Sequence, residues 1–394
     1  SKLWAEQEVV DEAAEEFSNT PKLLQKAVDI CGPYVWKQFD LLVMPPSFPF
    51  GGMENPCLTF VTPTILAGDK SLTNIVAHEI AHSWAGNLVT NANFEHFWIN
   101  EGFASFVEAK VATNDSASRD FHAIRKLQEL KNCLSGQLAN KTVLSKLVLN
   151  LSGLSPEDSY STVPYVKGEI FLRYLEDLLG GPKSFEPFLR YFFDKFKFQS
   201  IRTPQVKAAV IEYFKKDYAK ELAQVDWNTW LYGEGMPPVI PKYDQTMAEA
   251  SNRHAKIWAK SKVDDIDTTR LSGQLTSTQV IDLLLKLNAE ANITDLSDKF
   301  ISKFEKTYRI NKTKNSEIHF GFARLCIRAK LLDRLDEIFD FLNSNHRAKF
   351  ARPIYRDLSE WPDALGDTIS NYNKEKSGMM ATTSVQIARE LGLL

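Results

Sequence analysis

The chain has 394 residues, which favours two or three domains. It is 44% hydrophobic and 25% charged with a net charge of −3, values that are ordinary for a globular protein and that exclude a broad basic surface for nucleic acid. No run approaches the roughly 18 apolar residues of a membrane span, and four widely spaced cysteines predict no disulfide framework, so we expect a cytoplasmic protein without a membrane span.

The first sixty residues predict one helix followed by extended segments. Residues 4–31 have the apolar periodicity of a helix, and residues 35–44 resemble a strand that the prolines after it end. Residues 50–60, FGGMENPCLTF, predict a turn-rich or extended piece near the edge of a sheet. The opening, SKLWAEQEVVDEAAEEF, is acidic and polar, unlike a signal peptide, and it lacks an initiator methionine, so we expect that an upstream segment has been removed.

The segment GGMEN, which runs from Gly51 to Asn55, is a candidate peptide-binding edge. Its two glycines let a backbone lie close against a ligand, as at sheet edges that recognise peptides. Glu54 would then be a fixed carboxylate beside a cleft, where it could pair with the free α-ammonium of a peptide. On its own the segment would be read as a loop with a solvated glutamate; the motif that follows favours the binding interpretation.

Two helices are predicted after this segment. Residues 71–88 have a helical apolar pattern with a serine or threonine N-cap at its start and a stop near Gly86. Residues 99–112 form the second helix, which carries Glu101 and, on the same face, Glu108.

His78, Glu79 and His82 in HEIAH, together with Glu101, predict a zinc site with a base. Residues i and i+4 of a helix share one face, so both imidazoles can reach one ion. Catalytic zinc takes three ligands and leaves a position for water, and Glu79 lies where a general base would act on that water. Alone, HEIAH matches many surface helices, and the two histidines could be core residues beside a salt-bridged Glu101. That interpretation does not explain the carboxylate in WINEG, separated from His82 by eighteen residues, so we favour zinc.

Residues 117–233 are predicted to be mostly helical, with an irregular interruption at 144–168. Tyr165 lies in this interruption. Its phenol could donate a hydrogen bond to a developing oxyanion, or it could be a half-buried aromatic side chain.

A run rich in glycine and proline at 233–245 predicts an interdomain linker. We therefore expect a catalytic domain at 1–232 and an all-helical domain at 246–394, where amphipathic helical patterns recur and strand patterns are absent.

Four stretches resemble the motifs of the gluzincin zinc aminopeptidases: GGMENP, HEIAHSWAGNLVTN, HFWINEGF and YSTVPYVKG. GGMEN rather than GAMEN points to the branch of leukotriene A-4 hydrolase and aminopeptidase B, and HRAKFARPIYRDL near the C-terminus favours leukotriene A-4 hydrolase. The resemblance covers essentially the whole chain. It implies a mainly α fold with a small β-sheet, in which a thermolysin-like catalytic domain precedes an all-helical, superhelical C-terminal domain.

The resemblance also implies one Zn²⁺ per chain and a role for each matching residue. The zinc ligands would be His78, His82 and Glu101. Glu79 would be the general base, and Tyr165 would stabilise the tetrahedral intermediate. The matching residues that would bind substrate are Gly51, Gly52, Met53, Glu54, Asn55, Tyr160, Arg347 and Lys349. Glu54 would hold the α-amino group, and the basic pair would hold the substrate carboxylate; without the resemblance this pair would be read as solvated surface charges.

The chain departs from this family in three places. It has nothing like the family's β-rich N-terminal domain, so we expect a fragment, a processed form or a natural truncation in which one wall of the cleft is missing. Phe50 stands where a tyrosine often precedes GGMEN. The acidic position before the pocket tyrosine appears as Glu157-Asp158, which weakens the expectation of leukotriene production.

We expect a zinc aminopeptidase that removes N-terminal residues from short peptides, using metal-activated water and Glu79 as the base. One alternative is hydrolysis of a fatty-acid epoxide such as leukotriene A-4 at the same zinc, with Arg347 anchoring the carboxylate. Another is an inactive, truncated peptide-binding module, against which the intact set of ligands, base and Tyr165 argues.

Overall fold

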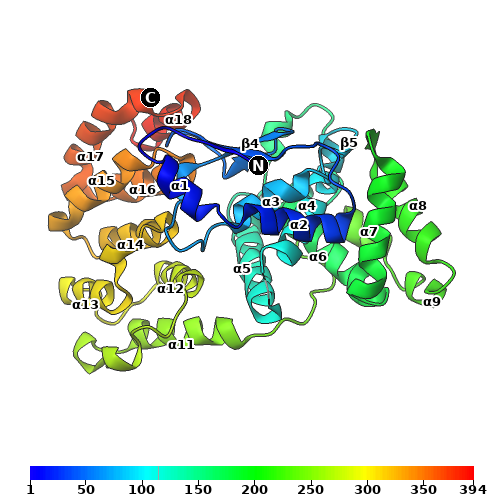
Figure 1. Ribbon diagram of the computed structural model, residues 1–394. Helices are drawn as coiled ribbons and strands as arrows, with labels where there is room; N and C mark the ends of the chain where they lie inside the picture. The colour runs from blue at the N-terminus through cyan, green and yellow to red at the C-terminus, as the bar shows by residue number, and fades with distance from the viewer. Residues whose placement is uncertain (114) are drawn as a thin grey trace.

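The computed structural model describes residues 1–113 and 115–394 and shows a mainly helical chain with two small sheets (Figure 1). The α-helices are α1 (Val10–Glu16), α2 (Thr20–Cys31), α3 (Asn74–His82), α4 (Trp98–Val111), α5 (Ser116–Ser135), α6 (Val163–Leu178), α7 (Pro182–Phe196), α8 (Thr203–Phe214), α9 (Ala219–Leu222), α10 (Trp227–Tyr232), α11 (Thr246–Lys260), α12 (Ser277–Ala289), α13 (Asp298–Tyr308), α14 (Ser316–Arg328), α15 (Leu335–Ser344), α16 (Ala348–Ser359), α17 (Pro362–Glu375) and α18 (Ala381–Glu390). The strands are β1 (Leu3–Trp4), β2 (Asp40–Val43), β3 (Gly52–Met53), β4 (Leu58–Val61), β5 (Val89–Asn91) and β6 (Gln199–Ile201). The predicted fold class, mainly α with a small sheet, is confirmed.

The larger sheet has the strand order β1-β2-β4-β3. β1, β2 and β4 run parallel, whereas β3 is antiparallel to β4, with Gly52 opposite Val61 and Met53 opposite Phe60. β3 is therefore an edge strand, as predicted for the GGMEN segment, and no described strand pairs with its outer side. An edge of this kind leaves backbone donors and acceptors free for an extended ligand.

The centre of the N-terminal half is α4, which contacts α3 on one side and α6 on the other. Every residue of α4 except Lys110 is buried, as expected of a helix that is covered on all sides. α4 and α6 approach closely at two glycines: a Cβ on Gly102 would lie 2.9 Å from Gly168 Cα. The missing side chains bring the start of α6 against the start of α4, next to Glu101.

Three predicted boundaries were wrong. Residues 4–31 form β1 and two helices, α1 and α2, because a turn at 17–19 separates the helices and Pro21 starts the second one. The helix predicted over 71–88 ends at His82. The chain turns there so that Ala85 can bridge to Val89, and Gly86 adopts a φ of +123°. The irregular stretch predicted to reach residue 168 stops earlier, since α6 begins at Val163 with a proline in its first turn.

Residues 233–245 contain no helix or strand and lead to α11, along the bottom of Figure 1. All the regular elements of residues 246–394 are helices, joined by short connections. Four helices contact one another in series: α12, α14, α16 and α18. Two further helices pack beside this series, since α15 contacts α14, α17 contacts α16, and α15 and α17 contact each other. Among the described residues, no helix is long and apolar enough to cross a membrane.

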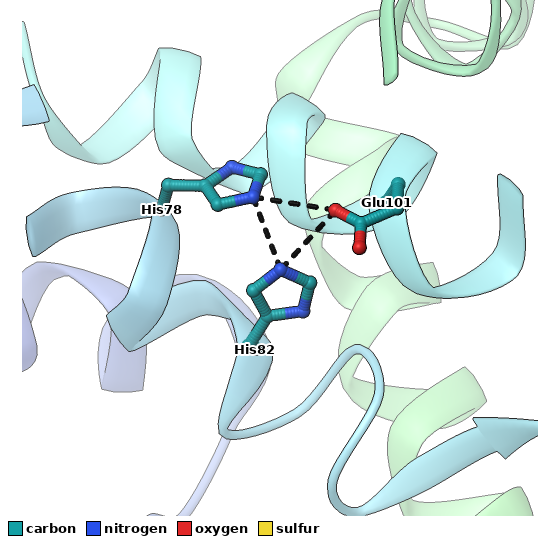
Figure 2. Close-up of side chains that lie close together, drawn as sticks. All are labelled: His78, His82 and Glu101. Carbon is teal, nitrogen blue, oxygen red and sulfur yellow. Dashed lines mark hydrogen bonds and ion pairs between the residues drawn. The ribbon is translucent and has the colours of Figure 1, made fainter. Parts of the chain in front are cut away.

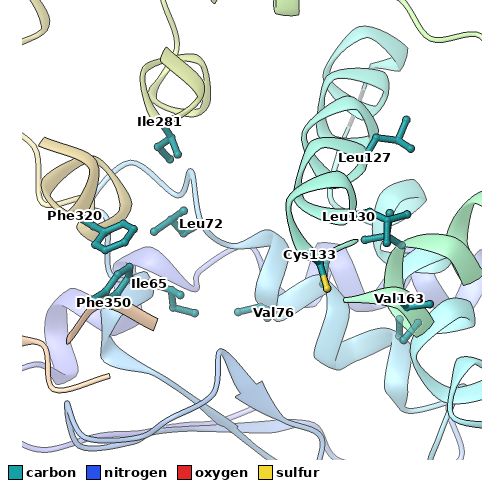
Figure 3. Close-up of a cluster of buried hydrophobic side chains, with 14 of the residues drawn as sticks. Ile65, Leu72, Val76, Leu127, Leu130, Cys133, Val163, Ile281, Phe320 and Phe350 are labelled. Carbon is teal, nitrogen blue, oxygen red and sulfur yellow. The ribbon is translucent and has the colours of Figure 1, made fainter. Parts of the chain in front are cut away.

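The C-terminal helices dock against the segment that joins β4 to α3. One hydrophobic core extends through both halves, and Figure 3 shows Phe320 and Phe350 beside Ile65 and Leu72. Polar contacts fix the same junction: Asn315 Nδ2 donates to Ser71 Oγ at 2.8 Å. This docking brings residues near 347 to the strands that precede the HEIAH helix.

Candidate functional site

His78, His82 and Glu101 converge on one point (Figure 2). Both histidines project from α3, one turn apart, and Glu101 projects from the first turn of α4. The two imidazole Nε2 atoms are 3.0 Å apart, and each lies 3.3 Å from Glu101 Oε2. Ligand atoms about 2.1 Å from a tetrahedral ion lie about 3.4 Å from one another. The spacing of the three atoms therefore fits one tetrahedral metal ion.

The opposite nitrogens of both imidazoles have their own partners. His82 Nδ1 lies 2.7 Å from the carbonyl oxygen of Ala85, which can only accept, so Nδ1 carries the proton. His78 Nδ1 lies 3.1 Å from Glu108 Oε2 and is held in the same tautomer. In the neutral rings both Nε2 atoms then present lone pairs toward each other and toward a carboxylate, an arrangement that a cation stabilises.

Unsatisfied buried oxygens support a cation at this point. Glu101 Oε2 is buried and has no hydrogen bond among the described residues, since its 3.3 Å contacts with the imidazoles lack hydrogen-bond geometry. Burial raises the pKa of Glu101, but the adjacent imidazoles, when protonated in the absence of a metal ion, outweigh it and lower the pKa to about 2. A buried carboxylate that stays ionised without a hydrogen bond is a typical metal ligand.

Glu79 lies beside this cluster, buried on α3. Its Oε2 has no hydrogen bond among the described residues. A side chain at Gly52 would overlap with the Glu79 carboxylate, so the glycine lets β3 pass directly over it. Burial raises the pKa of Glu79, and the carboxylates of Glu54 and Glu101 add to the effect while both imidazoles oppose it, which leaves the pKa at about 7.

Glu54 follows β3 and points toward the same cluster. Its Oε1 lies 3.8 Å from His82 Nδ1, and its main-chain carbonyl accepts a hydrogen bond from Asn87 Nδ2 at 2.8 Å. Glu54, Glu79 and His82 form a second group that could hold a metal ion. The contact of Glu54 with His82 runs through Nδ1, whose proton is already donated to Ala85 O, so we assign the ion to the group with Glu101.

Tyr165 lies in the first turn of α6, where the contact of α6 with α4 holds it above the cluster. Its ring stacks on His78 with centroids 6.0 Å apart and an interplanar angle of 25°. The hydroxyl lies 3.2 Å from the Tyr160 hydroxyl. Burial, with Glu101 adding to it, raises the pKa of Tyr165 well above its ordinary value, so the phenol keeps its proton and can donate it.

The predicted basic pair is divided by the fold. Arg347 is buried and donates to Thr64 Oγ1 at 3.3 Å. Its Nη2 lies about 3.4 Å from the position that a Cβ atom on Gly51 would occupy. Lys349 is half-exposed, and its ammonium pairs with Glu317. The structure thus brings Arg347 to the peptide-binding edge and leaves Lys349 engaged by a carboxylate on α14.

The remaining predicted substrate residues surround this edge. Met53 is exposed on β3, and Asn55 forms a turn in which its N–H donates to Met53 O at 2.9 Å. Tyr160 and Asp158 are both exposed. The side chain of Glu157 lies outside the part of the chain that the structure describes.

A buried charge network behind His78 was only partly predicted. Glu108 was expected on the face of Glu101, and its two oxygens accept hydrogen bonds from His78, from Asn74 and from Lys126. Lys126 Nζ also donates to Glu169 Oε2 at 2.8 Å, which joins α4, α5 and α6. The chain offers no local motif for Lys126, because its partners are 18 and 43 residues away.

Two family descriptions match the chain. The Peptidase family M1 domain matches residues 16–230, and the description "Leukotriene A4 hydrolase, C-terminal" matches residues 275–391. The chain therefore belongs to peptidase family M1, a family of zinc metallopeptidases, and carries the C-terminal helical region typical of leukotriene A4 hydrolases.

The chain is similar to leukotriene A-4 hydrolases and to aminopeptidase B, the two proteins of the branch that the GGMEN motif predicted. The chain is 42% identical to leukotriene A-4 hydrolase from Xenopus laevis, over 99% of the chain and 64% of that protein. It is 36% identical to aminopeptidase B from Rattus norvegicus, over 91% of the chain and 56% of that protein. The structure is similar to that of yeast LTA4 hydrolase in complex with bestatin, with a TM-score of 0.92, 32% identity, and coverage of 99% of the chain and 65% of that structure. The chain thus spans about two thirds or less of the length of these relatives.

Proposed function

We propose that this protein is a zinc aminopeptidase that removes N-terminal residues from short peptides. The observation that carries the proposal is the meeting of two carboxylates, Glu54 and Glu79, at a three-ligand site on the free edge of a sheet. Three ligands hold one ion per chain, one carboxylate serves as base, and the other receives the chain end of the substrate.

Zinc bound by His78, His82 and Glu101 would polarise the scissile carbonyl and lower the pKa of a water molecule. Glu79 accepts the proton of the attacking water and then passes it to the leaving amine. A general base works best when its pKa is raised toward the working pH, and burial acts in that direction on the pKa of Glu79. Because Gly52 has no side chain, β3 can lie directly against this carboxylate.

Tyr165 donates its hydroxyl proton in a hydrogen bond to the oxyanion that develops on the scissile carbonyl. Stacking on His78 supports the ring, and the Tyr160 hydroxyl lies 3.2 Å from the phenol oxygen. The peptide itself extends along β3, whose outer edge offers backbone hydrogen bonds.

Glu54 makes the enzyme an exopeptidase, because an internal peptide bond offers no ammonium group to pair with its partly buried carboxylate. Glu54→Gln should raise KM for a tripeptide about 10–100-fold, the loss expected for a hydrogen bond between charged groups. Steady-state kinetics on a tripeptide and on its N-acetylated form would measure this. An acetylated peptide cleaved as fast as the free one would contradict the role of Glu54.

Glu108 orients His78, so its loss should weaken zinc binding. Residues that hydrogen-bond to a metal ligand contribute about 10–100-fold to metal affinity, and we expect that loss for Glu108→Gln. Competition with a chromophoric chelator would give the zinc Kd. Glu186→Gln is a matched control. Glu186 pairs with Lys110, which lies on the same helix as Glu108, but it does not contact a predicted zinc ligand. Equal zinc affinities for both variants would contradict the assignment.

A second candidate activity is hydrolysis of a fatty-acid epoxide such as leukotriene A-4. It is favoured by the buried Arg347, which could anchor a fatty-acid carboxylate near the same ion. Comparing turnover of an aminoacyl anilide with turnover of the epoxide separates the two activities. A zinc-loaded protein that binds peptides but hydrolyses neither compound would instead be a peptide-binding module.

We also propose a catalytic domain at 1–232, a linker at 233–245 and a helical domain at 246–394, since the linker contains no helix or strand. The cytoplasm is the proposed location, which agrees with four cysteines that form no disulfide.

A further inference from the structure

We infer that Thr64 is a positioning residue for the substrate's C-terminal carboxylate: its hydroxyl holds the Arg347 guanidinium against the peptide-binding edge. This inference rests on the proposed function and adds to it the means by which a residue far along the chain is aligned with β3. It predicts that Thr64 tunes the preference for short peptides that end in a free carboxylate.

Thr64 lies in the 3-10 helix η1 (Pro63–Ile65), which follows β4. Arg347 Nη1 lies 3.3 Å from Thr64 Oγ1, and both side chains are buried. A guanidinium only donates, so the threonine oxygen is the acceptor. Thr62 Oγ1 lies 3.0 Å from the same oxygen and accepts from Thr64 N at 3.2 Å, which fixes the threonine rotamer.

The same short segment also fixes the peptide-binding edge. Thr62 N donates to Gly51 O at 3.0 Å. A Cβ atom added to Gly51 would lie 3.4 Å from Arg347 Nη2, so the guanidinium lies close to this strand edge. From the other side, Ser316 Oγ on α14 donates to Thr64 O at 2.9 Å. Thr62 and Thr64 therefore link the edge that binds the peptide backbone with the cation that receives its far end.

The Arg347 guanidinium has a donor without a partner in the described part of the protein. Its Nε is buried and has no hydrogen bond among the described residues. Among the residues that the structure describes, no carboxylate forms an ion pair with the Arg347 guanidinium. The neighbouring Lys349 is paired with Glu317. The guanidinium also lies over the Phe350 ring, with its carbon 5.7 Å from the centroid. Without the Thr64 hydroxyl, the aromatic contact alone would not fix the rotation of the guanidinium plane.

Binding can be measured without turnover in a Glu79→Gln background. The zinc-loaded protein is titrated by calorimetry with a tripeptide and with the same tripeptide as its C-terminal amide. We expect the parent to prefer the acid, and Thr64→Val to lower the acid-to-amide affinity ratio about tenfold. Thr64→Ser, which keeps the hydroxyl, should restore the ratio. Thr59→Val, at a buried threonine on β4 that does not touch Arg347, should leave the ratio unchanged.

A second background shows whether Thr64 acts through Arg347. In Arg347→Ala the preference for the acid should be lost already, and adding Thr64→Val should change nothing further. A parent that prefers the acid, combined with a Thr64→Val variant that keeps this preference, would overturn the inference alone. Equal losses of affinity for acid and amide would also overturn it, because they would indicate only a structural effect. A parent without any preference for the acid would overturn the proposed carboxylate site, and the inference with it.

Discussion

Replacing Glu79 with Gln should lower kcat for a tripeptide by about 10³-fold while the protein keeps its zinc. General acid–base catalysis contributes about 10²–10⁴-fold, and here one group would both remove the proton from water and deliver it to the leaving amine. Glutamine has nearly the same shape as glutamate, so the side chain should still fit beneath Gly52. It cannot accept a proton at neutral pH.

Parallel measurements on the Glu79→Gln variant would be kcat, zinc content by atomic spectroscopy, and affinity for a tripeptide. We expect only kcat to fall steeply. Glu212→Gln, a change at an exposed carboxylate paired with Lys195, is the control for the same chemical substitution outside the site. A Glu79→Gln variant with the kcat of the parent would show that another group is the base.

Glu101→Gln should cause a larger loss of zinc affinity than Glu108→Gln. Glu101 supplies a negatively charged ligand atom at 3.3 Å from both imidazole nitrogens, whereas Glu108 acts only through the far side of His78. We therefore expect more than the roughly 100-fold loss that is the upper end for residues hydrogen-bonded to a ligand. Turnover should fall in proportion to zinc occupancy.

A zinc titration of Glu101→Gln, with activity followed in the same samples, checks this. Excess zinc should restore part of the activity, because His78, His82 and Glu79 remain. Thermal unfolding of the zinc-free forms serves as the control for folding. A variant that binds zinc as tightly as the parent would place the ion elsewhere, and the group of Glu54, Glu79 and His82 would be the first to test.

The meeting of the two histidines in the candidate site could be predicted from the sequence because it depends on local helix geometry. Residues four apart on a helix share a face, so His78 and His82 had to meet if α3 formed. The length of α3 could not be predicted in the same way, since its end depends on the bridge between Ala85 and Val89 rather than on its own helical pattern. The split of residues 4–31 also depends on a long-range partner, because β1 forms only where β2 is available to pair with it.

The substrate end of the site shows what local patterns cannot reveal. Arg347 and Thr64 are 283 residues apart, and nothing in the composition around either residue indicates their contact. Only the family resemblance singled out Arg347 and Lys349, and for peptide substrates it gave both residues the same role. The structure separates them, because Glu317 on α14 engages Lys349 and leaves Arg347 at the peptide edge.

One assay tests directly whether this protein is a zinc aminopeptidase whose metal is bound by His78, His82 and Glu101. Zinc-loaded and chelator-treated protein are each incubated with a tripeptide that has a free N-terminus and with its N-acetylated form, and product release is followed by mass spectrometry. We expect one zinc per chain and release of the first residue from the free tripeptide by the zinc-loaded protein alone. Cleavage that survives removal of zinc, or equal cleavage of the acetylated peptide, would contradict it.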